Sequence, residues 1–126
     1  MNHLQSSTPV AFLYVKDRER ALNFYRGTLG FPLRSSDGFG DFIDFGLGLI
    51  RMTVLPDFSA TPHPVLGWNV GDISAAARAL RDRGVVFNIH EGMGQDALGI
   101  WTSPDGSSKV AFFSDPDGNV LTLSQS

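Results

Sequence analysis

The sequence predicts an α+β protein made of two similar halves, because one pattern occurs twice along its 126 residues. The segment VAFLYVKDRERALNFYR, which begins at Val10, aligns with VLGWNVGDISAAARALR, which begins at Val65. In both segments an apolar run leads to an aspartate, after which apolar residues recur every three or four positions until a glycine. This pattern is typical of a strand, an N-capping Asp, an amphipathic helix and a glycine stop. The repeat therefore predicts a duplicated module.

The first half is predicted to contain a strand, a helix and three more strands. Residues 1–8 are polar and are expected to be loose. A buried strand covers residues 10–16, and Asp17 caps a helix that ends at Gly30. The three following strands, separated by a Ser-Asp-Gly turn and by a glycine pair, are expected at 31–35, 39–45 and 49–55.

The second half repeats this order after a proline-rich linker at residues 56–64. We therefore divide the single domain of residues 1–126 into a module at 9–55 and a module at 65–125. A strand at 65–71 leads to a helix at 72–83. Further strands are expected at 85–90, 100–103, 109–114 and 120–124, with a Gly-rich loop at 91–99 and an Asp-Pro-Asp-Gly-Asn turn at 115–119.

Composition excludes several classes of function. The formal net charge is −3 with no basic cluster, so neither a nucleic-acid partner nor an anionic membrane is expected. No apolar run approaches the roughly 18 residues of a membrane span, and the N-terminus lacks the pattern of a signal peptide. The absence of cysteine excludes disulfides, thiolate metal sites and cysteine nucleophiles. These features predict a cytoplasmic protein.

Five short motifs occur along the chain: Val-Lys-Asp at 15–17, Phe-Tyr at 24–25, Leu-Gly-Phe at 29–31, Arg-Gly-Val at 83–85 and Asp-Pro-Asp-Gly-Asn at 115–119. In their order and spacing the sequence resembles the vicinal oxygen chelate superfamily. This superfamily includes glyoxalase I, extradiol dioxygenases, fosfomycin-resistance transferases and bleomycin-resistance proteins. The resemblance implies two βαβββ modules that form an incomplete, curved β-barrel with the helices outside. It also implies a ligand cleft inside the curved sheets and a homodimer.

The resemblance further implies where a metal would bind. In metal-using members His, Gln or Glu ligands lie near the start of the first strand and on the last strand of each module. Those positions correspond here to Val10, Met52, Val65 and Thr122. Valine has no donor atom, and Met sulfur and a neutral Thr hydroxyl are poor ligands for Zn²⁺ or Mg²⁺. The sequence therefore predicts no metal and no cofactor at these positions.

An alternative is a metal-dependent lyase, isomerase or dioxygenase whose ligands have moved to His63, His90 or Glu91. His63 lies between two prolines in the linker, and the adjacent His90 and Glu91 would face opposite sides of a strand. No serine is linked by a motif to a histidine and an acid, so no catalytic residue is predicted.

Strand alternation predicts which residues meet a ligand. The expected ligand-binding residues are mainly apolar, with a few polar groups: Val10, Phe12, Tyr14, Met52, Val65, Asn69, Trp101, Thr122 and Ser124. Ile50 and Val54 are expected to face the ligand beside Met52. Asp41 and Asp44 add negative charge that would favour a cationic guest, but acidic residues on an edge strand are usually just solvated, and that is the interpretation we prefer.

The leading hypothesis is a metal-free protein that sequesters or senses a planar, apolar or weakly cationic small molecule, as bleomycin-resistance members do. A third possibility is an accessory module that has lost its ligand and binds another protein through its sheet surface.

Overall fold

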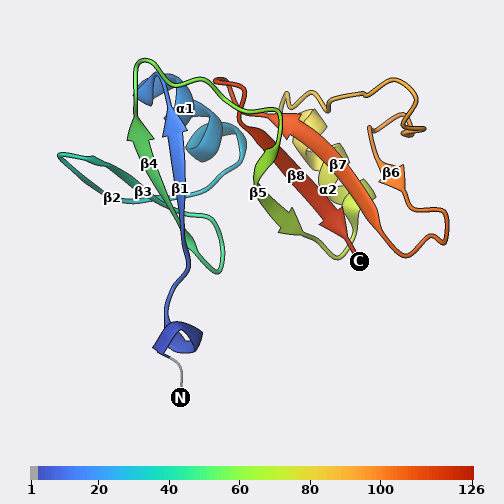
Figure 1. Cartoon of the computed structure of the whole chain (residues 1–126), viewed down its shortest axis with the longest axis horizontal. Coiled ribbons are helices and arrows are strands. Elements are labelled where there is room, and N and C mark those ends of the chain that lie inside the picture. Colours follow the sequence, from blue (N-terminus) through green and yellow to red (C-terminus); the bar gives the residue numbers. More distant parts are fainter. Residues whose placement is uncertain (1–2) are drawn as a thin grey trace. The chain divides into compact units, whose positions relative to one another are not determined.

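The computed structural model describes residues 3–126, and the chain divides into two compact units between Phe58 and Ser59. Each unit contains a strand, a helix and three further strands in that order (Figure 1). The predicted α+β class, with one βαβββ module in each half, is therefore confirmed. In the described part of the chain, no helix combines the length and the apolar character needed to cross a bilayer.

The first unit contains a four-stranded sheet, sheet A, in the order β1-β4-β3-β2. Strand β1 is parallel to β4, and the other neighbours are antiparallel. The elements are η1 (His3–Ser6), β1 (Val10–Val15), α1 (Arg18–Leu22), the π-helical η2 (Asn23–Thr28), β2 (Leu33–Asp37), β3 (Gly40–Asp44) and β4 (Leu49–Val54). Residues 3–6, expected to be loose, thus form a short 3₁₀ turn, whereas residues 1 and 2 lie outside the described part.

The predicted first helix begins as expected and ends differently. The Asp17 carboxylate accepts a hydrogen bond from the Arg20 N–H at 3.1 Å, which confirms the cap. After Leu22 the helix widens into the π-helical turn η2, in which the Leu29 N–H donates to the Phe24 carbonyl. Gly30 then adopts a φ of 81°, a conformation that favours glycine, and ends the helical segment.

The second unit contains a four-stranded sheet, sheet B, in the order β5-β8-β7-β6. Its elements are β5 (Pro64–Asn69), α2 (Ile73–Asp82), β6 (Trp101–Thr102), β7 (Lys109–Ser114) and β8 (Val120–Gln125). Asp72 caps α2 by accepting from the Ala75 N–H at 3.0 Å. The predicted turn at 115–119 forms around the buried Asp115 carboxylate, which accepts from the N–H groups of Asp117 and Asn119 at 2.9 Å each.

The prediction of a strand at residues 85–90 is wrong. The segment makes only a single β-bridge, from Phe87 to Phe113, and forms no strand. The side chain of Gln95 occupies the backbone groups that a neighbouring strand would use. Its oxygen accepts from the His90 N–H at 2.7 Å, and its amide nitrogen donates to the carbonyls of Asn88 and Gly99 at 2.9 and 2.8 Å. Residues 85–99 therefore form an irregular connection between α2 and β6.

Candidate functional site

The side chains of strand β1 alternate between the two faces of sheet A. Leu13 and Val15 are buried, whereas Val10, Phe12 and Tyr14 are 40%, 69% and 40% exposed. Alternate side chains of a strand point to opposite faces, so Val10, Phe12 and Tyr14 share one face, which we name the open face of sheet A. The predicted alternation along β1 is confirmed.

Strand β4 does not present the residues that were expected. Met52 pairs with the buried Leu13 and is itself fully buried, whereas Arg51 pairs with Phe12. Paired residues of neighbouring strands project to the same face, so Arg51 and Thr53 belong to the open face. The expectation that Met52 faces a ligand beside Phe12 is therefore wrong, and the same correction applies to Ile50 and Val54.

The error is a slip of one residue, caused by turns of different length in the two units. The β3–β4 turn comprises residues 45–48, between the paired Asp44 and Leu49. The corresponding β7–β8 turn comprises residues 115–119, one residue longer, between the paired Ser114 and Val120. Aligning the turn glycines shifts β4 by one position, and a shift of one reverses the face of every side chain. The structural counterpart of Thr122 is Arg51.

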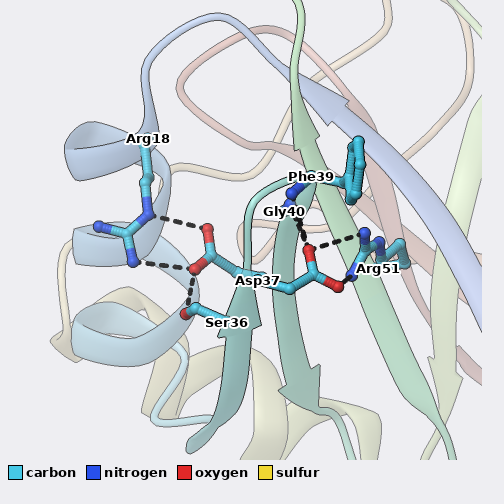
Figure 2. Close-up of polar contacts among 7 residues, drawn as sticks. Arg18, Ser36, Asp37, Phe39, Gly40 and Arg51 are labelled. Carbon is cyan, nitrogen blue, oxygen red and sulfur yellow. Dashed lines mark hydrogen bonds and ion pairs between the residues drawn. The ribbon is translucent and has the colours of Figure 1, made fainter.

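An aromatic and cationic row crosses the open face of sheet A. Phe12 of β1, Arg51 of β4 and Phe42 of β3 are consecutive partners across the strands. The Arg51 guanidinium carbon lies 4.5 Å from the centroid of the Phe42 ring. Two nitrogens of this guanidinium donate to the Asp37 carboxylate at 2.9 and 3.0 Å (Figure 2). The Asp37 carboxylate also accepts from two backbone N–H groups in the β2–β3 turn.

A second arginine–carboxylate pair lies on the opposite, helix-facing side of sheet A. Arg18 of α1 donates two hydrogen bonds to Asp41, at 2.9 and 2.8 Å, and the Ser36 hydroxyl donates a third (Figure 2). The Asp41 side chain is only 3% exposed. Asp41 is therefore a buried, paired carboxylate, so the expectation that it is solvated is wrong, and so is the alternative that it attracts a cationic guest.

The two pairs lower the pKa of both carboxyls. Burial alone would raise the pKa of Asp41, but hydrogen bonds from Arg18 and Ser36, together with the charges of Arg18 and Arg51, outweigh it and lower the pKa. The Arg51 hydrogen bonds, followed by the Phe39 N–H, lower the pKa of Asp37. Both carboxyls are therefore anionic at neutral pH, and the two pairs carry no net charge.

Four of the predicted ligand-binding residues lie on one face of sheet B. Asn69, Ser124, Val110 and Trp101 are consecutive partners across its four strands. The Ser124 hydroxyl donates to the Asn69 side-chain oxygen at 3.3 Å. In the adjacent row Thr122 pairs with Gly67. The face thus brings together Asn69, Trp101, Thr122 and Ser124.

Close packing restricts the edge of this face. A Cβ atom on Gly67 would collide with the Thr122 side-chain oxygen and lie 3.2 Å from the Thr122 carbonyl oxygen, so a larger residue would require Thr122 to move. Val65 lies at a register shift in β5 and is 47% exposed. The ring of His90 lies edge-on to Phe112, with the ring centroids 5.6 Å apart.

The donor set does not fit the divalent metal that the resemblance implies. Val10 and Val65 offer no donor atom, and the counterpart of Thr122 is the cationic Arg51. Within residues 3–126, no group of three His, Cys, Asp or Glu side chains is arranged to hold a metal ion. His63, His90 and Glu91 therefore do not form such a group.

Sequence reasoning missed the two arginine–carboxylate pairs. Arg18 and Asp41 are 23 residues apart, and no local pattern joins them. Arg51 could have been assigned to this face by pairing the residues of the β3–β4 hairpin outward from its turn, where Asp44 pairs with Leu49. That count places Phe42 opposite Arg51.

Comparisons with solved structures agree with this fold. A glyoxalase family protein from Enterococcus faecalis superposes with a TM-score of 0.75 at 18% identity, over 96% of this chain and 98% of that one. A superfamily member from Sphaerobacter thermophilus gives 0.69 at 25% identity, over 96% and 98%. TnmS3, an antibiotic-binding protein from Streptomyces sp. CB03234, gives 0.67 at 25% identity, over 95% of each chain.

No sequence among curated proteins matches the chain. The profile of the Glyoxalase/Bleomycin resistance protein/Dioxygenase superfamily, in contrast, matches residues 1–123, which is nearly the full length. This match confirms the resemblance inferred from the five motifs. The chain belongs to the Glyoxalase/Bleomycin resistance protein/Dioxygenase superfamily.

Proposed function

We propose that the protein binds a flat, mainly apolar small molecule on the open face of sheet A, without a metal ion. The observation that carries the proposal is the exposure of Phe12, at 69%, on a strand whose alternate residues are buried. Covering the exposed part of a phenylalanine contributes roughly 2 kcal/mol to binding. Val10 and Tyr14 extend the apolar strip on either side of Phe12.

Charge on this face supports a neutral ligand. The Arg51 guanidinium is stacked on Phe42 and neutralised by Asp37, so the row presents flat groups without net charge. The cationic preference expected from Asp41 has no basis, because Asp41 is buried and paired with Arg18. A planar aromatic molecule is therefore the ligand class that we propose.

The likeness to TnmS3 supports the binding role. TnmS3 is described as an antibiotic-binding protein, and this chain matches it over 95% of both lengths. The same fold and size therefore suit the binding of a small organic molecule. The donor set at Val10, Arg51, Val65 and Thr122 supports binding that needs no divalent ion.

Calorimetric titration with a matched pair of compounds tests this proposal. We expect 2-naphthol, which is planar, to bind more tightly than decahydro-2-naphthol, which has the same ring skeleton without the flat rings. Phe12→Ser should weaken 2-naphthol binding about tenfold, a loss of about 1.4 kcal/mol.

The matched control is Leu47→Ser, which removes a 99% exposed apolar side chain from the β3–β4 turn and should leave binding unchanged. Equal binding of both compounds, or unchanged binding by Phe12→Ser, would contradict the proposal. The homodimer implied by the resemblance remains a separate proposal, which sedimentation equilibrium tests.

A further inference from the structure

The irregular connection between α2 and β6 in the second unit surrounds an apolar hollow of about 230 Å³. Its lining includes Arg81 at the end of α2 together with Val86, Phe87, Ile89, Ala97 and Leu98. Phe87 forms a β-bridge with Phe113, whose side chain is buried on the helix-facing side of sheet B. The hollow is therefore separate from the sheet face that carries Asn69 and Thr122.

Beside the hollow, the backbone of residues 85–90 meets sheet B at the Phe87–Phe113 bridge, next to which the Asn88 N–H donates to the Phe112 carbonyl at 2.7 Å. The Gln95 side chain stands between the backbones of Asn88 and Gly99 and bonds to both. Val86 and Ile89 are 82% and 64% exposed beside the hollow. A volume of 230 Å³ accommodates a chain of roughly six to eight carbon atoms, at about 30 Å³ per small group.

Arg81 supplies a positive charge to this apolar lining. Its ion pair with the adjacent Asp82 is long, at 3.8 Å, and both side chains are more than half exposed. Such a pair contributes little and does not prevent the guanidinium from binding another anion. The arginine fork is well suited to a carboxylate.

Two polar groups that are close in sequence to the lining residues have hydrogen-bond partners within the chain. One Asp96 carboxylate oxygen accepts from the N–H groups of Leu98 and Ile100 at 2.9 Å each. The Leu80 carbonyl, at the end of α2, accepts from the N–H groups of Arg83 and Val85. Arg81 is the charged residue in the lining of the hollow, so its guanidinium sets the charge of a ligand.

We propose that this hollow binds an apolar monocarboxylate of about six to eight carbons. The tail lies against Val86, Ile89 and Leu98, and the carboxylate pairs with Arg81. The site uses no residue of sheet A, so it is independent of the aromatic ligand proposed above.

Nuclear magnetic resonance titration of the isotope-labelled full chain with octanoate tests this site. We expect octanoate to shift the backbone amides of residues 86–89 and 97–98 in a saturable way. Octylammonium has the same tail and the opposite charge, so it should bind at least about tenfold more weakly. Octylammonium binding as tight as octanoate, or octanoate shifts confined to other residues, would overturn the proposal.

Three variants separate the charge from the fold. Arg81→Gln should weaken octanoate about tenfold, whereas Arg81→Lys, which keeps the charge but loses the planar fork, should weaken it less than Arg81→Gln does. Arg78→Gln removes an exposed charge from the same helix outside the lining and should change affinity less than about twofold. An unchanged affinity in Arg81→Gln would overturn the proposal. Phe12→Ser should leave octanoate binding intact, which distinguishes a failure here from a failure of the aromatic site.

Discussion

Arg18 and Asp41 join α1 to the centre of sheet A through two hydrogen bonds of 2.9 and 2.8 Å. The Asp41 side chain is 3% exposed, while that of Arg18 is 50% exposed, so the pair connects the interior with the surface. On the other side of the same sheet, Arg51 and Asp37 form a second pair. The two pairs hold α1, β2, β3 and β4 together from both faces.

The first prediction concerns this buried carboxylate. Asp41→Asn keeps the shape but removes the charge that Arg18 and Ser36 bind, and should lower the free energy of unfolding by about 1–3 kcal/mol. Asp37→Asn changes a more exposed carboxylate and should cost clearly less. Urea denaturation followed by circular dichroism measures both. Equal losses for the two variants would contradict the assignment of Asp41 as the buried member.

The second prediction concerns acid stability. Hydrogen bonds from the Ser107 N–H, the Ser103 hydroxyl and the Ser107 hydroxyl lower the pKa of Asp105 to about 2. The pKa values of Asp37 and Asp41 are lowered as well. Each of these carboxyls binds a proton more readily in the unfolded chain, where its pKa is near 3.8. These carboxyls therefore contribute their full stabilisation at pH values above this unfolded-chain pKa.

This stability should be lost as the pH falls from about 4 towards 2. Urea midpoints measured between pH 7 and pH 2.5 check the expected acid limb. In Asp105→Asn the stability should fall less steeply on acidification. Between pH 6 and 7 its stability should change with pH in the same way as that of the parent protein. A stability that rises on acidification below pH 4 would contradict the lowered pKa values.

The third prediction concerns Gly67. A Cβ at this position would collide with the Thr122 side-chain oxygen and lie 3.2 Å from the Thr122 carbonyl oxygen. Gly67→Ala should therefore cost about 1–3 kcal/mol, and a second substitution, Thr122→Ala, should recover part of the loss. Gly27→Ala, where a Cβ meets nothing within 4 Å, should be close to neutral. Thermal denaturation of the four variants checks this, and an additive double mutant would be inconsistent with the contact.

The fourth prediction tests the corrected faces of sheet A. Met52→Ala should destabilise the protein by about 2–5 kcal/mol, because Met52 is fully buried. Arg51→Met should weaken binding of a planar ligand without a comparable loss of stability, because the introduced methionine side chain still covers Phe42. Urea denaturation and calorimetry separate the two effects. Loss of ligand affinity in Met52→Ala with unchanged stability would restore the original assignment.

Much of this fold follows from local sequence patterns. The Asp caps, the alternation along β1 and the Asp115 turn depend on neighbouring residues, and each was predictable. The strand expected at 85–90 failed because the side chain of Gln95, five and seven residues further along, bonds to its backbone groups. Propensity alone does not report such competition.

The candidate site was only partly predictable for a related reason. Phe12 and Tyr14 follow from alternation within one strand, but Arg51 depends on the length of a turn. The β3–β4 turn is one residue shorter than its counterpart in the repeat, so the alignment selected Met52 in place of Arg51. The Arg18–Asp41 pair depends on tertiary packing over 23 residues and left no local signal.

The central claim is that a flat apolar ligand binds the open face of sheet A without a metal. The most direct test is to map the amide shifts caused by 2-naphthol on isotope-labelled protein that has been treated with a chelator and dialysed. We predict saturable shifts at Val10, Phe12, Tyr14 and Thr53 with no added metal. Shifts that require added Zn²⁺ or Mn²⁺, or that centre on His90 and Glu91, would contradict the account and favour a metal-dependent enzyme.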